Sequence, residues 1–322
     1  MRIAIVGTGT LGVRMLTPLL TSEHEVVAVI LDGRISQGYK RWLGPRLARY
    51  FRGSFSLAGQ ARKFGIPIYY IDKMTETEVA PLKALDLDLI LVGGFSIILN
   101  KPLLEIPKIG CVNTHSSLLP RHRGPNPFSA AILAGDEETG VSFHWMDEDI
   151  DTGEVIAQFS LPLDERSTML GLYKNACELA GHEIVGVLDS IADGTATSMP
   201  QDESLATYEK KTLVADSWID WAATAEAIDR QVRGMSPQPC VRFRWKNVLV
   251  FIHRVLYSPT PVDAAPGTVL ENRPLIKVAT GEGTIRIRVA FRQKPIPWLW
   301  PGWGKRPEVG EVLDGPPPAP LD

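Results

Sequence analysis

The chain has 322 residues, with 44% hydrophobic and 22% charged residues and a formal net charge of −3. This length is sufficient for two domains, and the composition is typical of a globular protein rather than a fibrous or disordered one. The apolar runs are too short for a signal peptide or a membrane span, so we expect a cytoplasmic protein without membrane contact.

Charge is distributed unevenly along the chain. Lys and Arg outnumber Asp and Glu by 16 to 12 in residues 205–322, whereas in residues 1–204 they are outnumbered by 18 to 25. The basic C-terminal third is a mild indication of a polyanionic partner. The three cysteines, Cys111, Cys177 and Cys240, form no close pair and no metal-binding pattern. They indicate buried thiols in a reducing compartment and no bound metal.

The N-terminus predicts a buried strand at residues 2–7, a glycine-rich turn and a helix. The turn matches Gly-x-Gly-x-x-Gly through Gly7, Gly9 and Gly12, and Asp32 ends the next predicted strand. This is the fingerprint of a dinucleotide site in its strand-turn-helix setting. An NAD-dependent oxidoreductase is therefore one hypothesis, although close backbone packing also selects glycines.

Residues 33–71 contain no acidic residue, and basic side chains are interleaved with aromatic ones. Such a stretch suits a phosphate-rich ligand with a ring that can stack, and a solvated helix face is the alternative. Arg34 and Arg41 in this stretch are candidate contacts for such a ligand. A third strand is predicted at 66–70 and a helix at 75–84.

The next two predicted strands, at 89–92 and 109–114, lead into the candidate site. Open parallel sheets bind ligands at the carboxyl ends of their strands. Asn113 and His115 are two residues apart at such an end, so their side chains share one face. Asp151 comes from a later segment and could face them. An amide, an imidazole and a carboxylate around one cavity are suited to acyl chemistry.

A hydrolase triad is a second way to combine these residues. His115 and Asp151 could activate Ser116 or Ser117 as the nucleophile. The Gly-x-Ser-x-Gly turn that exposes such a serine is absent from the sequence, which disfavours this hypothesis.

The remaining elements predict an α/β fold, a doubly wound, mostly parallel Rossmann-like sheet with a smaller C-terminal β-barrel of the OB type. We expect helices at 125–134, 167–191 and 219–234, strands at 140–146 and 154–161, a hairpin turning at Lys246 and Asn247, and short strands at 267–271, 275–279 and 284–291. The predicted domains are a catalytic domain at 1–193, a linker at 194–216, the barrel at 217–314 and a disordered tail at 315–322. Trp298, Trp300 and Trp303 could stack on bases, fill a dimer contact or close the barrel.

Several motifs of this chain resemble those of the 10-formyltetrahydrofolate-dependent formyltransferases. They are Asn113-Thr-His115-Ser-Ser-Leu-Leu-Pro120, Arg123-Gly124, Met146-Asp147 and Asp151-Thr-Gly153. The likeness extends from Met1 to Pro237, and the layout with a C-terminal barrel is most similar to that of the methionyl-tRNA formyltransferases.

The resemblance implies that 10-formyltetrahydrofolate is the co-substrate and that no metal is needed. Asn113 and a protonated His115 would hold the oxyanion of the tetrahedral intermediate, while Asp151 raises the pKa of His115 or positions a water. By the same resemblance the pterin would be walled by Phe95, Ile97, Leu99, Ser117, Leu118, Leu119, Pro120, Met146, Asp147, Asp149 and Ile150.

The resemblance leaves the amine acceptor open between two classes. The full-length architecture and the basic stretches favour methionyl-tRNA, with initiator tRNA as the partner. Pro125-Asn126-Pro127-Phe128 departs from the tRNA-specific pattern and favours a small amine such as a nucleotide-linked amino sugar. The candidate acceptor contacts are Arg34, Arg41, Arg123 and Asn126.

Overall fold

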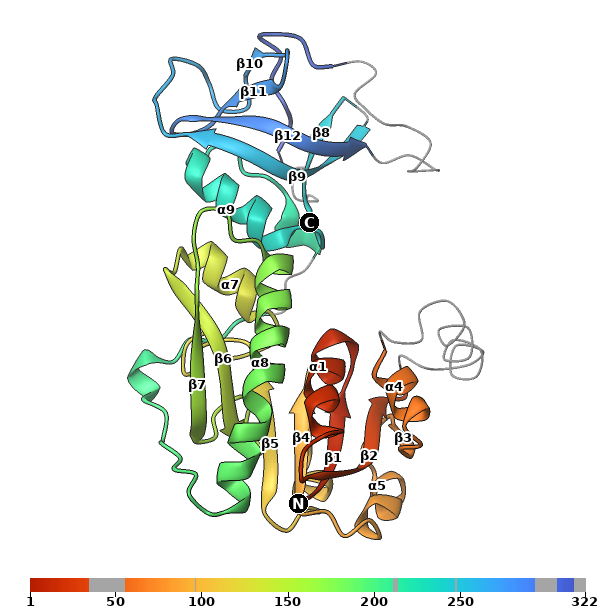
Figure 1. Ribbon diagram of the computed structural model, residues 1–322. Coiled ribbons are helices and arrows are strands. Elements are labelled where there is room, and N and C mark those ends of the chain that lie inside the picture. The colour runs from red at the N-terminus through yellow and green to blue at the C-terminus, as the bar shows by residue number, and fades with distance from the viewer. Residues whose placement is uncertain (35–55, 96, 211–213, 247, 293–305, 316–322) are drawn as a thin grey trace, which may run out of the picture. The chain divides into compact units, whose positions relative to one another are not determined.

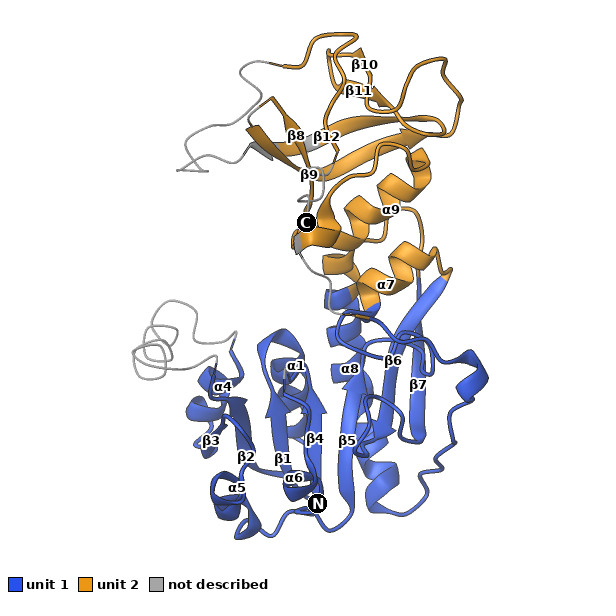
Figure 2. Ribbon diagram, turned by 180° about the vertical axis from the view of Figure 1, so that it is seen from behind, with its two compact units in different colours: residues 1–127, 138–162, 173–209 blue, residues 128–137, 163–172, 210–322 orange. Residues whose placement is uncertain are grey.

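The computed structural model describes residues 1–34, 56–95, 97–210, 214–246, 248–292 and 306–315 (Figure 1). The predicted acceptor residue Arg41, the three tryptophans Trp298, Trp300 and Trp303, and the tail from residue 316 lie outside these ranges. The chain forms two compact units (Figure 2). Unit 1 comprises Met1–Pro127, Glu138–Pro162 and Tyr173–Glu209, and unit 2 comprises Phe128–Glu137, Leu163–Leu172 and Lys210–Asp322. The predicted domains were continuous stretches of chain, so they did not assign the two short segments, Phe128–Glu137 and Leu163–Leu172, to the C-terminal unit.

Unit 1 is built on a seven-stranded sheet in the order β3-β2-β1-β4-β5-β6-β7. Its first five strands are parallel, and β6 and β7 are antiparallel. The strands are β1 (Arg2–Gly7), β2 (Glu25–Asp32), β3 (Ile68–Ile71), β4 (Leu89–Gly93), β5 (Gly110–His115), β6 (Glu138–Trp145) and β7 (Val155–Pro162). The strand order reverses between β1 and β4, so the predicted doubly wound, mostly parallel sheet is confirmed.

The helices of unit 1 start at the expected signals. Ser56 accepts a hydrogen bond from the Gly59 amide, and Thr75 forms a capping box with Glu78. Helix α1 packs on α4, and α5 packs on α6. These helices are α1 (Gly9–Leu19), α4 (Leu57–Lys63), α5 (Glu76–Lys83) and α6 (Lys101–Leu104), and the longer α8 (Met169–Ala192) follows β7.

Packing accounts for the glycines of the N-terminal turn. A Cβ on Gly7 would lie 2.3 Å from the carbonyl oxygen of Gly93, and Gly9 has a left-handed φ of +63°. The acid of the fingerprint, Asp32, is 1% exposed and accepts hydrogen bonds from the backbone and the guanidinium of Arg34. The features that favoured a dinucleotide site therefore have structural roles within the chain.

Unit 2 contains a five-stranded antiparallel sheet in the order β10-β11-β12-β9-β8. The strands are β8 (Val241–Trp245), β9 (Val248–Ser258), β10 (Val269–Glu271), β11 (Ile276–Ala279) and β12 (Thr284–Arg292), and α7 (Pro127–Ala134) and α9 (Ala225–Met235) are its helices. The helix predicted from residue 219 begins six residues later, because Thr224 caps it by accepting from the Ala227 amide. Ile219 and Trp221 enter the core from the extended chain before α9.

A short C-terminal segment joins the two edges of this sheet. Arg244 of the edge strand β8 exchanges backbone hydrogen bonds with Asp314, and at the other edge Val269 of β10 donates to Glu311. Between these contacts Leu313 is 2% exposed and lies in the core. The curled sheet is thus covered at both edges, which is the closure expected of a small barrel.

We predict that Leu313→Ala destabilises unit 2 by about 2–4 kcal/mol, because it leaves a cavity at the closure of the barrel. Val312→Ala is the matched control. Val312 is 58% exposed, so its truncation should change the free energy of unfolding by less than about 0.5 kcal/mol. Urea unfolding followed by tryptophan fluorescence measures both, and equal effects of the two variants would contradict the closure described above.

Within the described parts of the chain, no helix has the length and apolar character needed to cross a membrane.

Candidate active site

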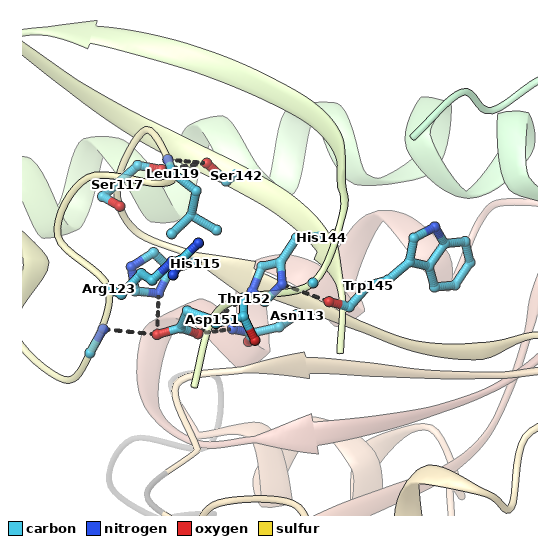
Figure 3. Close-up of polar contacts among 12 residues, drawn as sticks. Asn113, His115, Ser117, Leu119, Arg123, Ser142, His144, Trp145, Asp151 and Thr152 are labelled. Carbon is cyan, nitrogen blue, oxygen red and sulfur yellow. Dashed lines mark hydrogen bonds and ion pairs between the residues drawn. The ribbon is translucent and has the colours of Figure 1, made fainter. Parts of the chain in front are cut away.

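Three polar side chains meet where strand β5 ends. Asn113 and His115 lie on β5, where Asn113 is opposite His144 of β6. Asp151 lies in the turn between β6 and β7 and has a left-handed φ of 57°. The alternation of side chains along a strand places Asn113 and His115 on one face, as the sequence predicted. Figure 3 shows the Asp151 carboxylate between them.

The Asp151 carboxylate is held from both sides. Its Oδ1 accepts from Asn113 Nδ2 at 3.2 Å, and its Oδ2 accepts from the backbone N–H of Gly124 at 2.9 Å. His115 Nδ1 is 3.5 Å from Oδ2, and His144 Nε2 is 3.6 Å from Oδ1. The carboxylate is thus the common partner of the whole group (Figure 3).

These partners keep Asp151 ionised. Burial alone would raise the pKa of the carboxyl group, but the proximity of His144 and His115 and the hydrogen bond from Gly124 outweigh it and lower the pKa to about 2. The free-energy contribution of this shift is present above the ordinary pKa of an aspartate and is lost as the pH falls from about 4 toward 2. At neutral pH the site therefore carries a fixed negative charge.

His115 is buried between two hydrogen-bond acceptors. Its Nε2 is 2.9 Å from the carbonyl oxygen of His122, and its Nδ1 faces Asp151. Burial lowers the pKa of His115, and it outweighs the opposing effect of Asp151. The free protein therefore favours the neutral ring more than an exposed imidazole would, whereas the resemblance implied a protonated His115 at the oxyanion. Both ring nitrogens nevertheless have partners for the imidazolium form.

His144 is a site residue that sequence reasoning missed. Its Nδ1 is 2.8 Å from the carbonyl oxygen of Trp145 and must carry a proton there. In the neutral ring Nε2 then accepts from Asn113 Nδ2 at 3.1 Å. Both N–H bonds of the Asn113 amide are thus engaged, one by His144 and one by Asp151. Only the pairing of β5 with β6 reveals this contact, because nothing in the sequence position of His144 marks it as a partner of Asn113.

Arg123, which the sequence predicted as a contact for the acceptor, has a different role. It was expected to bind the acceptor, but its side chain is 0% exposed. Its five N–H groups donate to Gln201, Glu203 and Tyr208, so they are all used within the chain. Burial among these partners removes Arg123 from direct contact with an acceptor.

The predicted pterin wall divides into buried and accessible residues. Leu99, Ser117 and Leu119 are 3%, 0% and 5% exposed, and the Ser117 hydroxyl donates to the carbonyl of Arg121. These three side chains therefore support the loops rather than face a ligand. The Ser117 hydroxyl is directed to the Arg121 carbonyl, which disfavours Ser117 as the nucleophile of a hydrolase triad.

The remaining predicted wall residues are at least partly accessible. Phe95, Ile97 and Met146 pack against the hydrophobic core cluster that contains Leu99, and Leu118 and Pro120 are half-buried. In the following turn Asp147, Asp149 and Ile150 are exposed. The Asp147 carboxylate closes that turn by accepting from the Asp149 amide and the Thr152 hydroxyl.

The acceptor candidates Arg34 and Asn126 are at least partly exposed. The side chain of Arg34 is 47% exposed and its guanidinium pairs with Asp32 at 2.8 Å. Asn126 is half-buried just before α7. In the part of the chain that the structure describes, no group of three or more His, Cys, Asp or Glu side chains is arranged to hold a metal ion.

Comparison with solved structures identifies similar folds. WlaRD, a sugar 3N-formyl transferase solved with dTDP and 5-N-formyl-THF, matches with a TM-score of 0.67 and 19% identity, over 89% of this chain and 97% of that one. The N-formyltransferase from Helicobacter canadensis, in complex with folinic acid and dTDP-3-aminofucose, matches with a TM-score of 0.66 and 19% identity, over 89% and 98%. HypX from Aquifex aeolicus with tetrahydrofolic acid matches with a TM-score of 0.62 and 21% identity, over 91% and 44%.

Family models match most of the sequence. The formyl transferase model matches residues 1–188, and the model of the formyl transferase C-terminal domain matches residues 213–297. The first of these matches contains Asn113, His115 and Asp151. The chain belongs to the formyltransferase family.

Proposed function

We propose that this protein transfers the formyl group of 10-formyltetrahydrofolate to the primary amine of a small acceptor, a nucleotide-linked amino sugar. The observation that carries the proposal is the convergence of Asn113, His115 and Asp151 at the end of β5. Acyl transfer to an amine needs hydrogen-bond donors at the oxyanion and a route for one proton, and it needs no nucleophile on the enzyme.

In the proposed reaction the amine nitrogen attacks the formyl carbon, and the carbonyl oxygen becomes an oxyanion. The new bond makes the amine nitrogen acidic, and neutral His115 accepts its proton. Asp151 stabilises the imidazolium from 3.5 Å. The C–N10 bond then breaks as the proton passes to N10, which leaves tetrahydrofolate and the N-formyl product.

Asn113 is the proposed donor to the oxyanion. In the free protein its two N–H bonds are directed to His144 and Asp151. Donation to the oxyanion therefore requires that one of these hydrogen bonds is shared or exchanged when the substrate binds. His144 would take part in this exchange by accepting from, and so orienting, the amide.

Two observations support a folate donor and a small amine acceptor. The three matched structures were each solved with a folate, and two of them are sugar N-formyltransferases or contain an amino-sugar nucleotide. In this chain, Pro125-Asn126-Pro127-Phe128 follows the Arg123-Gly124 pair directly beside Asp151. Asn126 is then a candidate contact for the acceptor.

Methionyl-tRNA is the second candidate acceptor. The C-terminal formyl transferase domain and the excess of basic residues after residue 204 favour it, because a polyanion is attracted by such a surface. Initiator tRNA would then be a partner, with binding that weakens steeply as salt is raised.

A transfer assay with 10-formyltetrahydrofolate tests the proposal. The acceptors are a panel of dTDP-linked amino sugars, the matching dTDP sugars that carry a hydroxyl instead of the amine, and methionyl-tRNA. We expect a mass increase of one formyl group on an amino sugar and none on the hydroxyl controls. Formylation of methionyl-tRNA alone would contradict the amino-sugar assignment, and transfer to no amine would contradict the function itself.

A further inference from the structure

The side chain of Gln201 connects the turn that carries Asp151 to the buried Arg123. Its Nε2 donates to the carbonyl oxygens of Asp151 and Gly153, at 2.9 and 2.7 Å. Its Oε1 accepts from Arg123 Nε at 3.1 Å and from Nη2 at 2.8 Å. Both donors and both lone pairs of the amide are therefore used.

Arg123 determines which way this amide points. A guanidinium can only donate, so it selects the oxygen of Gln201 and turns the NH₂ group toward the two carbonyls. Glu203 holds the other edge of the guanidinium at 2.7 and 2.9 Å. A planar fork with every N–H engaged has little freedom to rotate, so the orientation of Gln201 is fixed.

Residues 201–209, which we call the strap, contain Gln201. The strap is hydrogen-bonded to Arg123, the residue before Gly124, and the Gly124 amide donates to Asp151. Thr207 accepts from the Arg123 amide at 2.9 Å, and Glu209 donates its amide to the Arg123 carbonyl at 2.8 Å. A Cβ on Gly124 would lie 2.6 Å from the carbonyl oxygen of Glu209, so the strap runs directly over this glycine.

We propose that Gln201 is a positioning residue for Asp151 and that Arg123 sets its orientation. The inference rests on the proposed formyl transfer. Asp151 holds a left-handed φ of 57° next to exposed residues of its own turn, Asp149 and Ile150. Gln201 fixes the backbone of this turn, while Gly124 and Asn113 fix the carboxylate. Loss of the backbone anchor lets the carboxylate move away from His115.

The first test is Gln201→Met, which keeps the length of the side chain and removes both amide donors. A displacement of a catalytic group by about 1 Å can cost roughly 100-fold in rate, so we expect kcat to fall roughly 10- to 100-fold. The KM values for the folate and for the amine should stay within about threefold, because the proposed role of Gln201 involves no contact with either substrate.

The second readout does not depend on activity. Asp151 raises the pKa of His115, so a carboxylate that moves away should lower that pKa further. Titration of the His115 Cε1–H signal by NMR in wild-type protein and in Gln201→Met measures the difference. An unchanged pKa of His115 together with wild-type kcat would overturn the proposal.

Gln201→Glu separates the two halves of the amide. A carboxylate still accepts from Arg123, and with charge, but it cannot donate to the Asp151 and Gly153 carbonyls. We expect a loss of kcat comparable to that of Gln201→Met, with a thermal midpoint closer to wild type. Full activity of Gln201→Glu would assign the role to the Arg123 contact alone and overturn the donor role.

Ser204→Ala is the matched control on the strap. Its hydroxyl donates to Asp202 at the surface, so kcat and KM should both match wild type. The wild-type assay separates this inference from the proposed function. If no amine is formylated, the function fails, while the His115 titration still decides whether Gln201 positions Asp151. Equal changes of kcat and KM with an unmoved His115 pKa would indicate a general structural role and would also reject the proposal.

Discussion

Asp151→Asn should reduce formyl transfer roughly 1,000-fold while leaving the fold intact. The substitution removes the charge that stabilises the His115 imidazolium, and it places an NH₂ group against the donors of Asn113 or Gly124. The amide cannot accept from both partners at once, so the side chain should also lose its orientation. Single-turnover transfer from 10-formyltetrahydrofolate, with the best acceptor of the panel, measures the loss in the chemical step.

Asp193→Asn is the matched control for this prediction. Asp193 follows α8 at the surface, and its carboxylate accepts from the amide and hydroxyl of Thr195, so its amide variant should transfer formyl at the wild-type rate. Circular dichroism and folate binding should be near wild type for both variants. Activity of Asp151→Asn within tenfold of wild type would remove Asp151 from the proposed proton route.

The sheet and the central pair of the site were predictable because they depend on local periodicity. Apolar runs predicted β1, β4 and β5 to within two residues, and the alternation of a strand put Asn113 and His115 on one face. Asp151 required one further step, the expectation that a later turn returns to the same strand end. The length of chain before Asp151, enough for a helix and a returning strand, made that step possible, and the family resemblance then gave Asp151 its expected role.

The remainder of the site depends on tertiary contacts that no local pattern encodes. His144 became a partner of Asn113 only through the antiparallel pairing of β5 and β6. Arg123 was expected to face a substrate because it follows a site loop, but residues 78 and 80 positions later bury it. An isolated arginine in a sequence does not reveal whether an acidic segment will return to cover it.

The helix predicted at residue 219 illustrates a different limit. Ile219, Ala222, Ala225, Ile228 and Val232 recur at helical spacing, and all of them except Ala222 are buried. Periodicity therefore identified most of the core residues but not the start of α9, which is set by the Thr224 cap, and Ala222 lies before that cap. Hydrophobic spacing reports which side chains are buried, and capping side chains report where the hydrogen bonds begin.

His115→Gln should reduce kcat roughly 100- to 10,000-fold, the range contributed by general acid–base catalysis. Glutamine can still donate to the His122 carbonyl, but it cannot accept and return a proton. His182→Gln is the matched control, because the His182 side chain is 82% exposed on α8 and should not affect transfer. A His115→Gln protein with wild-type kcat would contradict the assignment of the proton route.

The pH dependence distinguishes a neutral His115 from a protonated one. Because burial lowers its pKa, transfer that requires the neutral ring should decline only below pH 6.5, as the ring becomes protonated. A requirement for the imidazolium would give the opposite slope, with kcat/KM falling as the pH rises.

The stability of the protein should also depend on the protonation of His115. As the pH falls below 6.5 the unfolded chain takes up the proton before the folded one, so folding free energy is lost toward acid pH. His115→Gln lacks this term, and the stability difference between wild type and variant should therefore shift in favour of the variant between pH 6.5 and pH 5. Urea unfolding across that range measures the shift, and an unchanged difference would show that His115 does not have the lowered pKa on which its role as a proton acceptor depends.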